Sequence, residues 1–250
     1  MSGAPGTRTE EPRSARVNGA RLGDATWPEV EARASAGPTT LLVPLGATEQ
    51  HGPHLPLGTD SIIAVALVEA AAARIPGTVV APVLSYGSSG EHQDFPGTLS
   101  IGAAATEMVL VELGRSACET FDRLLFVNAH GGNAAPLAAA VERLRHEGRD
   151  ARAWFPRWDG DAHAGRTETS LILALAETDA RSTAVRGNDA PLGELIGRLQ
   201  DEGVRAVSPN GVLGDSTGAT AAEGRALVDA AVEDLAATLD AWPAAVEAGR

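Results

Sequence analysis

Two carboxylates and two histidines lie close together in one polar stretch, residues 46–60, and such side chains bind metal ions. The stretch contains Glu49, His51, His54 and Asp60 among glycines and prolines. Glu49 and His51 are two positions apart, so in an extended segment both side chains point to the same side. Carboxylate and imidazole ligands without a thiolate suit zinc, manganese or iron(II). The pattern therefore predicts a metal-binding loop.

The other histidines extend this prediction to further loops. The chain has six histidines. Five of them lie in glycine-rich segments that follow expected strands: His51, His54, His92, His130 and His163. The sixth, His146, falls on the face of an expected helix. Because parallel strands bring their carboxyl ends to one edge of a sheet, we expect the five loop histidines to gather there, and several of them to bind metal.

The elements that must position these loops alternate between strand and helix. Apolar runs predict strands at residues 40–45, 78–84, 123–128 and 150–155. Helical spacing predicts helices at residues 27–36, 61–75, 103–121, 134–147, 170–177, 192–202 and 221–242. The alternation predicts an α/β fold, a single-domain layered arrangement with a mainly parallel sheet flanked by helices. Asp60 is expected to cap the helix that follows it.

Length and composition favour a soluble, single-domain protein. The chain of 250 residues suits one domain, which we expect over residues 17–250. Residues 1–16 lack the apolar segment of a secretory signal and are expected to form a disordered tail. No apolar run is long enough to cross a bilayer, so no membrane partner is expected. The single cysteine, Cys118, cannot form an internal disulfide and fits a cytoplasmic protein.

The charge balance argues against several classes of function. The formal net charge of −13 disfavours nucleic acid as a partner, because phosphate binding needs a basic face. All 20 basic residues are arginines, so the chain has no lysine for Schiff-base chemistry or for a phosphate-binding loop. A dinucleotide or phosphate site at Gly131 and Gly132 is disfavoured as well, since no spaced glycine fingerprint accompanies them.

Three motifs together resemble the creatininase family of metal-dependent amidohydrolases. They are Glu49-Gln50-His51-Gly52-Pro53-His54 with Asp60, then Asn128-Ala129-His130-Gly131-Gly132-Asn133, then His163-Ala164-Gly165 with Glu168-Thr169-Ser170. The resemblance covers most of residues 40–175 and implies a creatininase-like α/β fold with two divalent metal ions: Zn, Fe(II) or Mn. It implies that Glu49 and His130 hold one ion and His51 the other. Asp60 would bridge the two.

One position departs from the family pattern. Creatininase places a metal-binding glutamate two residues after the histidine that His130 matches, and this chain has Gly132 there. We expect Glu168, at the same edge of the sheet, to replace that ligand. The alternative for Glu168 is an acid favoured at a helix start by the helix dipole. Three carboxylates, those of Glu49, Asp60 and Glu168, with one hydroxide would balance two divalent cations, and a neutral site is easier to bury.

Within the family, residues 85–102, 160–175 and 210–224 look most like the members that belong to the mycofactocin system. This resemblance implies a peptidase that removes the modified C-terminal Val-Tyr unit from a small ribosomal precursor peptide. It also implies a homo-oligomer, although no feature of the sequence fixes its size. Two alternatives are a creatininase-like hydrolase of a small cyclic amide and a non-catalytic, metal-dependent binding protein.

The expected mechanism is attack of a metal-bridging hydroxide on the amide carbon, since divalent cations lower the pKa of bound water toward about 7. The departing amine must take up a proton. Either His163 or the pair Glu91 and His92 would supply it, and the sequence does not choose between them. Arg166 is expected to bind a carboxylate of the substrate through its guanidinium group.

Overall fold

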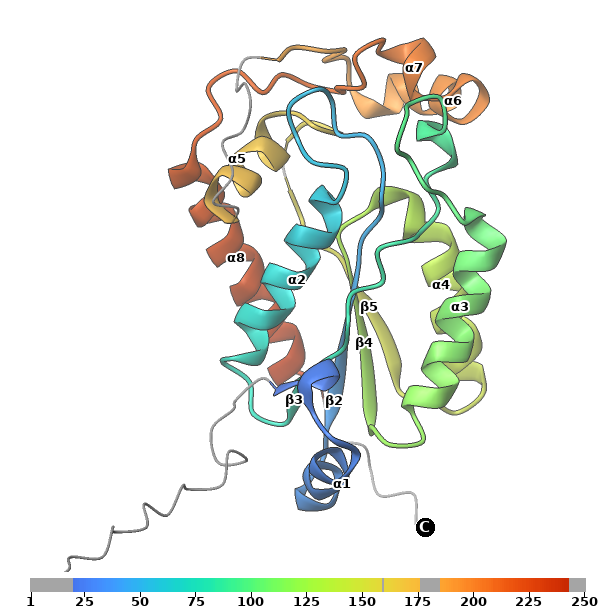
Figure 1. The fold of residues 1–250 in the computed structure, drawn as a ribbon, viewed down its shortest axis with the longest axis vertical. Coiled ribbons are helices and arrows are strands. Elements are labelled where there is room, and N and C mark those ends of the chain that lie inside the picture. Colours follow the sequence, from blue (N-terminus) through green and yellow to red (C-terminus); the bar gives the residue numbers. More distant parts are fainter. Residues whose placement is uncertain (1–19, 159, 176–184, 243–250) are drawn as a thin grey trace, which may run out of the picture.

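Five parallel strands form one sheet in the order β1-β3-β2-β4-β5 (Figure 1). They are β1 (Ala20–Arg21), β2 (Thr40–Leu45), β3 (Thr78–Val80), β4 (Arg123–Asn128) and β5 (Ala151–Trp154). The computed structural model describes residues 20–158, 160–175 and 185–242, so the predicted tail lies outside the described residues. β2 and β4 pair in register from Thr40 to Leu45, so their carboxyl ends lie side by side.

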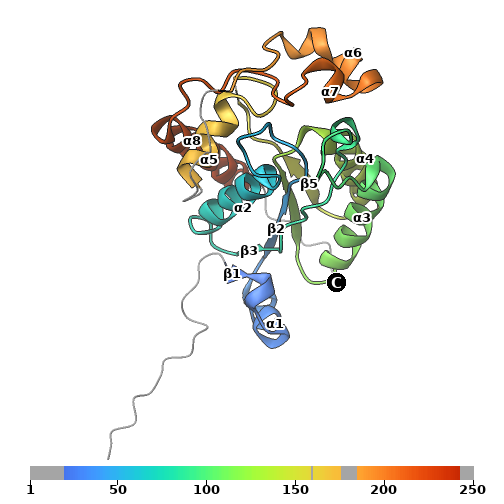
Figure 2. The same ribbon diagram turned by 45° about the horizontal axis from the view of Figure 1, so that its top comes forward.

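Helices cover both faces of this sheet (Figures 1 and 2). One face carries α2 (Thr59–Ala72), α5 (Arg166–Leu175) and α8 (Ala221–Asp240), which pack on one another, and the other face carries α3 (Gly102–Ala117) and α4 (Ala134–His146). α1 (Trp27–Ala36) precedes β2 at the amino end of the sheet. Beyond the carboxyl ends of the strands lie α6 (Leu192–Glu202) and the short α7 (Val204–Val207).

Burial on both faces explains why the central strands are apolar without alternation. Leu42 and Val127 belong to the core beneath α2, α5 and α8. Leu41 and Phe126, which point the opposite way, belong to the core beneath α3 and α4. Two helical layers on a parallel sheet thus leave the carboxyl edge of the sheet as the place where polar loops collect.

The predicted α/β architecture is confirmed, and α1, β2, β4 and α6 have the predicted bounds. β3 ends at Val80, four residues earlier than predicted; Leu84 makes only an isolated bridge with Leu45. Pro82, which has no N–H to donate to a ladder, interrupts that run. Strand β1 and helix α7 were not predicted. No helix among the described residues is long and apolar enough to span a membrane.

The expectation that Asp60 caps a helix is wrong. α2 begins at Thr59, and its capping residue is Gly58, which has no side chain. Asp60 lies within the first turn, where its carboxylate faces the rings of His51 and His130. The orientation of the Asp60 side chain is therefore determined by its charged partners in the buried site, and not by the free N–H groups at the start of the helix.

Candidate metal and catalytic site

Four loops at the carboxyl edge of the sheet bring five buried side chains together: Glu49, His51, His92, His130 and His163. Glu49 and His51 follow β2, His130 follows β4, and His163 lies between β5 and α5. His92 lies in η3 (Gly90–His92), a 3-10 turn in the loop after β3. Asp60 and Glu168 reach the same place from the first turns of α2 and α5.

Asn133 holds three of these loops in place. It lies at the end of η4 (Gly131–Asn133), and its Nδ2 donates hydrogen bonds of 3.1 Å to the Gly46 carbonyl and to Oδ1 of Asn128. Its Oδ1 accepts a hydrogen bond of 3.0 Å from the N–H of Ser88. The loops after β2, β3 and β4 are thereby cross-linked, which explains the asparagines on either side of His130 in the motif.

The first group of ligand atoms comes from Glu49, Asp60 and His130, and these atoms lie within 4.8 Å of one another. Nε2 of His130 donates to the Ser88 carbonyl over 2.8 Å. When the ring is neutral, its lone pair is therefore on Nδ1, which lies 3.4 Å from Oδ2 of Asp60. Metal-binding histidines usually donate their other ring N–H to a backbone carbonyl or a carboxylate in this way.

The second group comes from His51, His163 and Glu168, again within 4.8 Å. Nδ1 of His51 donates to the Glu49 carbonyl over 3.1 Å, and Nε2 lies 3.1 Å from Oδ1 of Asp60. Asp60 thus faces both groups, one oxygen toward each. Glu168 accepts a hydrogen bond of 2.5 Å from the N–H of Ala164, which orients its carboxylate.

The carboxylates of this cluster fit bound cations. Both side-chain oxygens of Glu49 and Oδ2 of Asp60 are buried and accept no hydrogen bond from the described residues. Burial is the main cause that raises the pKa of Glu49 to about 8. Burial lowers the pKa of His51, but the carboxylates of Asp60, Glu168 and Glu49 together outweigh this effect and raise that pKa to about 10. Without cations, the cluster therefore holds protons in their place.

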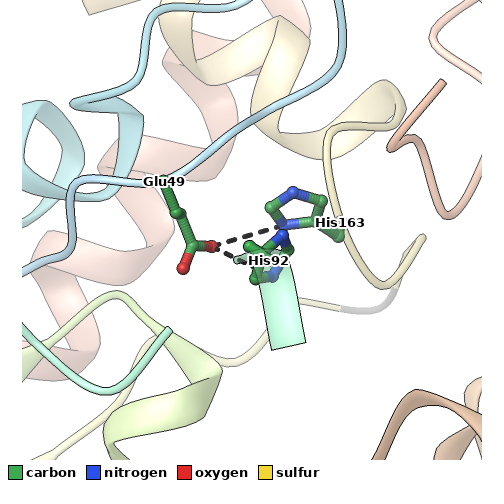
Figure 3. Close-up of side chains that lie close together, drawn as sticks. All are labelled: Glu49, His92 and His163. Carbon is green, nitrogen blue, oxygen red and sulfur yellow. Dashed lines mark ion pairs between the residues drawn. The ribbon is translucent and has the colours of Figure 1, made fainter. Parts of the chain in front are cut away.

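Of the other three rings of the cluster, His92 and His163 are neutral near pH 7, whereas the carboxylates of Glu49 and Asp60 raise the pKa of His130 against the effect of its burial. Burial, with the positive charge of His51, lowers the pKa of His92 to about 3. The same two causes lower the pKa of His163 well below its ordinary value. Figure 3 shows both rings beside the Glu49 carboxylate, with His92 Nε2 3.4 Å and His163 Nδ1 3.8 Å from its Oε1 atom.

Position 132 has no room for a side chain. A Cβ atom on Gly132 would lie 2.1 Å from the Ser88 carbonyl oxygen and 2.5 Å from Nε2 of His130. It would also lie 2.9 Å from Oε1 of Glu91. The hydrogen bond between His130 and Ser88 occupies this space, so a glutamate cannot enter here without moving that loop. Glu168 lies with the second group instead, and its role as a ligand remains a prediction.

A cavity of about 790 Å³ opens from the cluster. Its lining includes Glu49, His92, His130 and His163, together with Glu91, whose side chain is 32% exposed. The opposite wall belongs to α6, where Leu192 and Ile196 are exposed and line the same cavity. The cavity therefore joins a polar, ligand-rich floor to a wall that is apolar at Leu192 and Ile196 and polar at Gln200, Asp201 and Glu202.

Two predicted residues lie away from this floor. Arg166 is at the surface, and its Nε donates to both oxygens of Glu223 over 2.9 Å. It is not among the residues that line the cavity, and its role toward a substrate carboxylate remains a prediction.

His54 is buried and pairs through Nε2 with Oγ1 of Thr169 over 2.9 Å. Sequence reasoning assigned no role to Gln50, although its position between Glu49 and His51 is the signal that points to it.

Comparison with known proteins is in agreement with this site. Residues 23–239 match the model of the creatininase family, described as creatinine amidohydrolase. The mycofactocin precursor peptide peptidase of Mycobacterium ulcerans is 49% identical over 229 residues, 87% of each chain. That of Mycolicibacterium smegmatis is 51% identical over 210 residues, 81% of this chain and 85% of the relative. A solved creatininase variant of Zn-Zn type is 26% identical, with a TM-score of 0.76 over 89% of this chain and 98% of the other.

Proposed function

The chain belongs to the creatininase family, and we propose that it is a metal-dependent peptidase of the mycofactocin precursor peptide. In this proposal it hydrolyses one amide bond and releases the modified C-terminal Val-Tyr unit. The observation that carries the proposal is the buried carboxylate and histidine cluster at the floor of a cavity of about 790 Å³. The two peptidase relatives, 49% and 51% identical over most of the chain, support this substrate.

We infer two ion positions from the two groups of ligand atoms. Glu49, Asp60 and His130 would hold one ion, and His51 and Glu168, which lie together with His163, the other. Asp60 would contribute to the second ion as well, because its Oδ1 lies 3.1 Å from Nε2 of His51. The oxygens of Glu49 and Asp60 that lack a donor support this assignment, since an unpaired buried carboxylate is costly. Zinc, iron(II) and manganese all suit these ligands, and the ions when bound would supply Lewis acidity for the attack of water on the amide.

The cavity supports a peptide better than a small cyclic amide. Its volume of about 790 Å³ lies in the range of sites that enclose drug-sized ligands, and creatinine would fill a small part of it. Leu192 and Ile196, one helical turn apart on α6, present apolar surface to the cavity. We infer that this wall binds the substrate side chains next to the scissile bond. The amide itself would then lie over the polar floor.

Three groups at the floor are candidates for moving the proton that the departing amine requires: Glu91, His92 and His163. All three line the cavity. Glu91 and His92 are neighbours in η3, with His92 Nε2 3.9 Å from Oε1 of Glu91. Glu91 belongs to neither group of ligand atoms, so its carboxylate is free of the ions.

The test is to incubate the metal-loaded protein separately with the modified precursor peptide and with creatinine, and to measure product masses. We expect the peptide to lose the mass of its Val-Tyr unit plus the water gained in hydrolysis, and creatinine to remain intact. Conversion of creatinine alone would favour the small-amide alternative. Peptide that binds at saturating metal but stays uncut would identify a binding protein and refute the proposed activity.

A further inference from the structure

Gln50 is buried behind the rings of His92 and His163, and two backbone contacts fix which way its amide points. The N–H of Gly52 donates to Oε1 of Gln50 over 2.8 Å. Nε2 of Gln50 donates to the Gly211 carbonyl over 3.0 Å. A backbone N–H can only donate and a carbonyl can only accept, so the amide has one possible orientation, with its NH₂ group toward the histidines.

The hydrogens of this NH₂ group determine the protonation of His92. Nε2 of Gln50 has two hydrogens but three neighbouring atoms that could accept them. These are the Gly211 carbonyl oxygen at 3.0 Å, Nδ1 of His92 at 2.8 Å and Nε2 of His163 at 3.0 Å. Nε2 of His163 lies 2.8 Å from the backbone carbonyl of Gln50, so it carries a hydrogen and cannot accept another. The second amide hydrogen therefore goes to Nδ1 of His92, and the hydrogen of that ring is on Nε2.

His92 is thus oriented oppositely to the other three rings of the cluster. His51, His130 and His163 each lie with one nitrogen against a backbone carbonyl, of Glu49, Ser88 and Gln50. In the neutral form of each ring the hydrogen is on that nitrogen, so the nitrogen that faces the carboxylates is free to bind a metal, as in metal ligands. Nδ1 of His92 accepts a hydrogen bond from the amide of Gln50, so the ring directs its Nε2–H toward the carboxylates. Although Glu49, His92 and His163 are close enough to hold an ion, Nε2 of His92 has no lone pair for one.

We propose that Gln50 is a positioning residue that fixes the ring hydrogen of His92 on Nε2, as an N–H donor into the cavity, where it binds the carbonyl oxygen of the scissile amide. This role rests on the proposed peptidase activity. His92 lines the cavity and its Nε2 lies 3.4 Å from Oε1 of Glu49, so the N–H is at the cavity floor beside the proposed metal ligands, over which the amide would lie in the proposed activity. An imidazole N–H in such a position polarises a carbonyl by donating a hydrogen bond to its oxygen.

A direct test is to observe the ring nitrogens of the zinc-loaded, ¹⁵N-labelled full chain by long-range proton–nitrogen NMR. A variant with His92→Asn identifies the His92 signals. We expect Nδ1 of His92 to have the shift of an unprotonated nitrogen and Nε2 that of a protonated one. The reverse pattern, or coordination of zinc by Nε2 of His92, would overturn the inference. This measurement needs no variant of Gln50, so a folding defect cannot hide the answer.

Gln50→Glu provides the second test, because a carboxylate has no N–H for Nδ1 of His92. We expect the His92 hydrogen to move to Nδ1 and kcat to fall about 10–100-fold, the usual effect of losing such a supporting contact. Gln93→Glu makes the same chemical change at an exposed neighbouring position and should leave the His92 tautomer unchanged. An unchanged tautomer in Gln50→Glu would contradict the role of Gln50.

The two proposals fail separately. If the tautomer is as expected but the precursor peptide is not cut, the orientation of His92 stands and the peptidase activity fails. If the peptide is cut by a protein whose His92 carries its hydrogen on Nδ1, the activity stands and the inference about Gln50 fails.

Discussion

Nε2 of His51 lies 3.1 Å from Oδ1 of Asp60, and both side chains are buried in the cluster. Burial lowers the pKa of His51, but the carboxylate of Asp60, together with those of Glu168 and Glu49, outweighs this effect and raises that pKa to about 10. His51 and Asp60 thus form an ion pair at neutral pH when no cation is bound. Any ion that uses Nε2 of His51 as a ligand must first displace the proton that holds this pair together.

Metal binding should therefore release protons and strengthen as the pH rises. Ligands bind metal in their unprotonated forms, and the pKa values of Glu49 and His51 are about 8 and about 10 in the metal-free protein. Below pH 8 both groups must lose a proton on binding, and above pH 10 neither must. Calorimetric titration with zinc in buffers of different ionisation enthalpy measures this release. Binding at pH 7 without proton release would contradict the assignment of these two ligands.

The metal-free protein should become less stable as the pH rises from 6.5 to 9. Folded pKa values of Glu49 and His51 lie above their ordinary values of 4.5 and 6.5. The bound protons of these two groups contribute their full stabilisation when the pH is below the ordinary pKa values. This stabilisation is lost as the pH rises through the pKa values of the folded protein. Thermal unfolding with a chelator should show Tm falling over this interval. The Tm of the zinc-loaded protein should fall less over the same interval, because the ions take the place of the protons.

Glu168→Gln should lower the bound metal to about one ion per chain. Glu168 lies with His51 and His163, apart from the group formed by Glu49 and His130. An amide lacks the charge that balances the second cation, so only the first position should remain filled. Elemental analysis of the purified variant gives the ratio. Two tightly bound ions in this variant would show that Glu168 does not replace the ligand absent at Gly132.

Glu91→Gln should keep the metal and lose turnover. The side chain lines the cavity and belongs to neither group of ligand atoms, so the amide should not alter metal content. If Glu91 moves the proton to the departing amine, kcat should fall by about 10²–10⁴-fold. Elemental analysis and rate measurements on the same sample separate the two effects. Near-normal kcat would leave His163 as the proton donor.

Ile196→Ser should weaken peptide binding more than it slows the chemistry. Ile196 is 45% exposed on the wall of the cavity formed by α6, so the change should disturb the fold little. Loss of one apolar contact of this size costs about 1–3 kcal/mol, and KM should rise about 10-fold or more with kcat largely kept. Leu113→Ser, on α3 and outside the cavity lining, is the matched control. Equal KM values for both variants would exclude α6 from the substrate site.

Much of the fold follows from local sequence, and the exceptions have physical reasons. β2 and β4 were predictable because burial on both faces makes them continuous apolar runs. The end of β3 depended on Pro82, and the failure of Asp60 to cap α2 depended on charges that come from distant loops.

The site divides in the same way. The histidines and carboxylates were predictable as a group, since a parallel sheet brings its loops to one edge. Their individual roles depend on contacts between residues far apart in the chain, which no local pattern contains. Gln50 meets His92 across 42 positions, and Arg166 meets Glu223 across 57. The first contact orients one ring of the site, and the second binds the guanidinium group that was expected to bind substrate.

The most direct test of a metal-dependent peptidase is to follow release of the Val-Tyr unit by the same protein after chelation and after reloading with zinc, iron(II) or manganese. Glu49→Gln serves as the variant, because both oxygens of Glu49 lie in the cluster without a donor. We expect no release after chelation, recovery with at least one of these ions, and no recovery in the variant. Undiminished release by the chelated protein or by Glu49→Gln would contradict it.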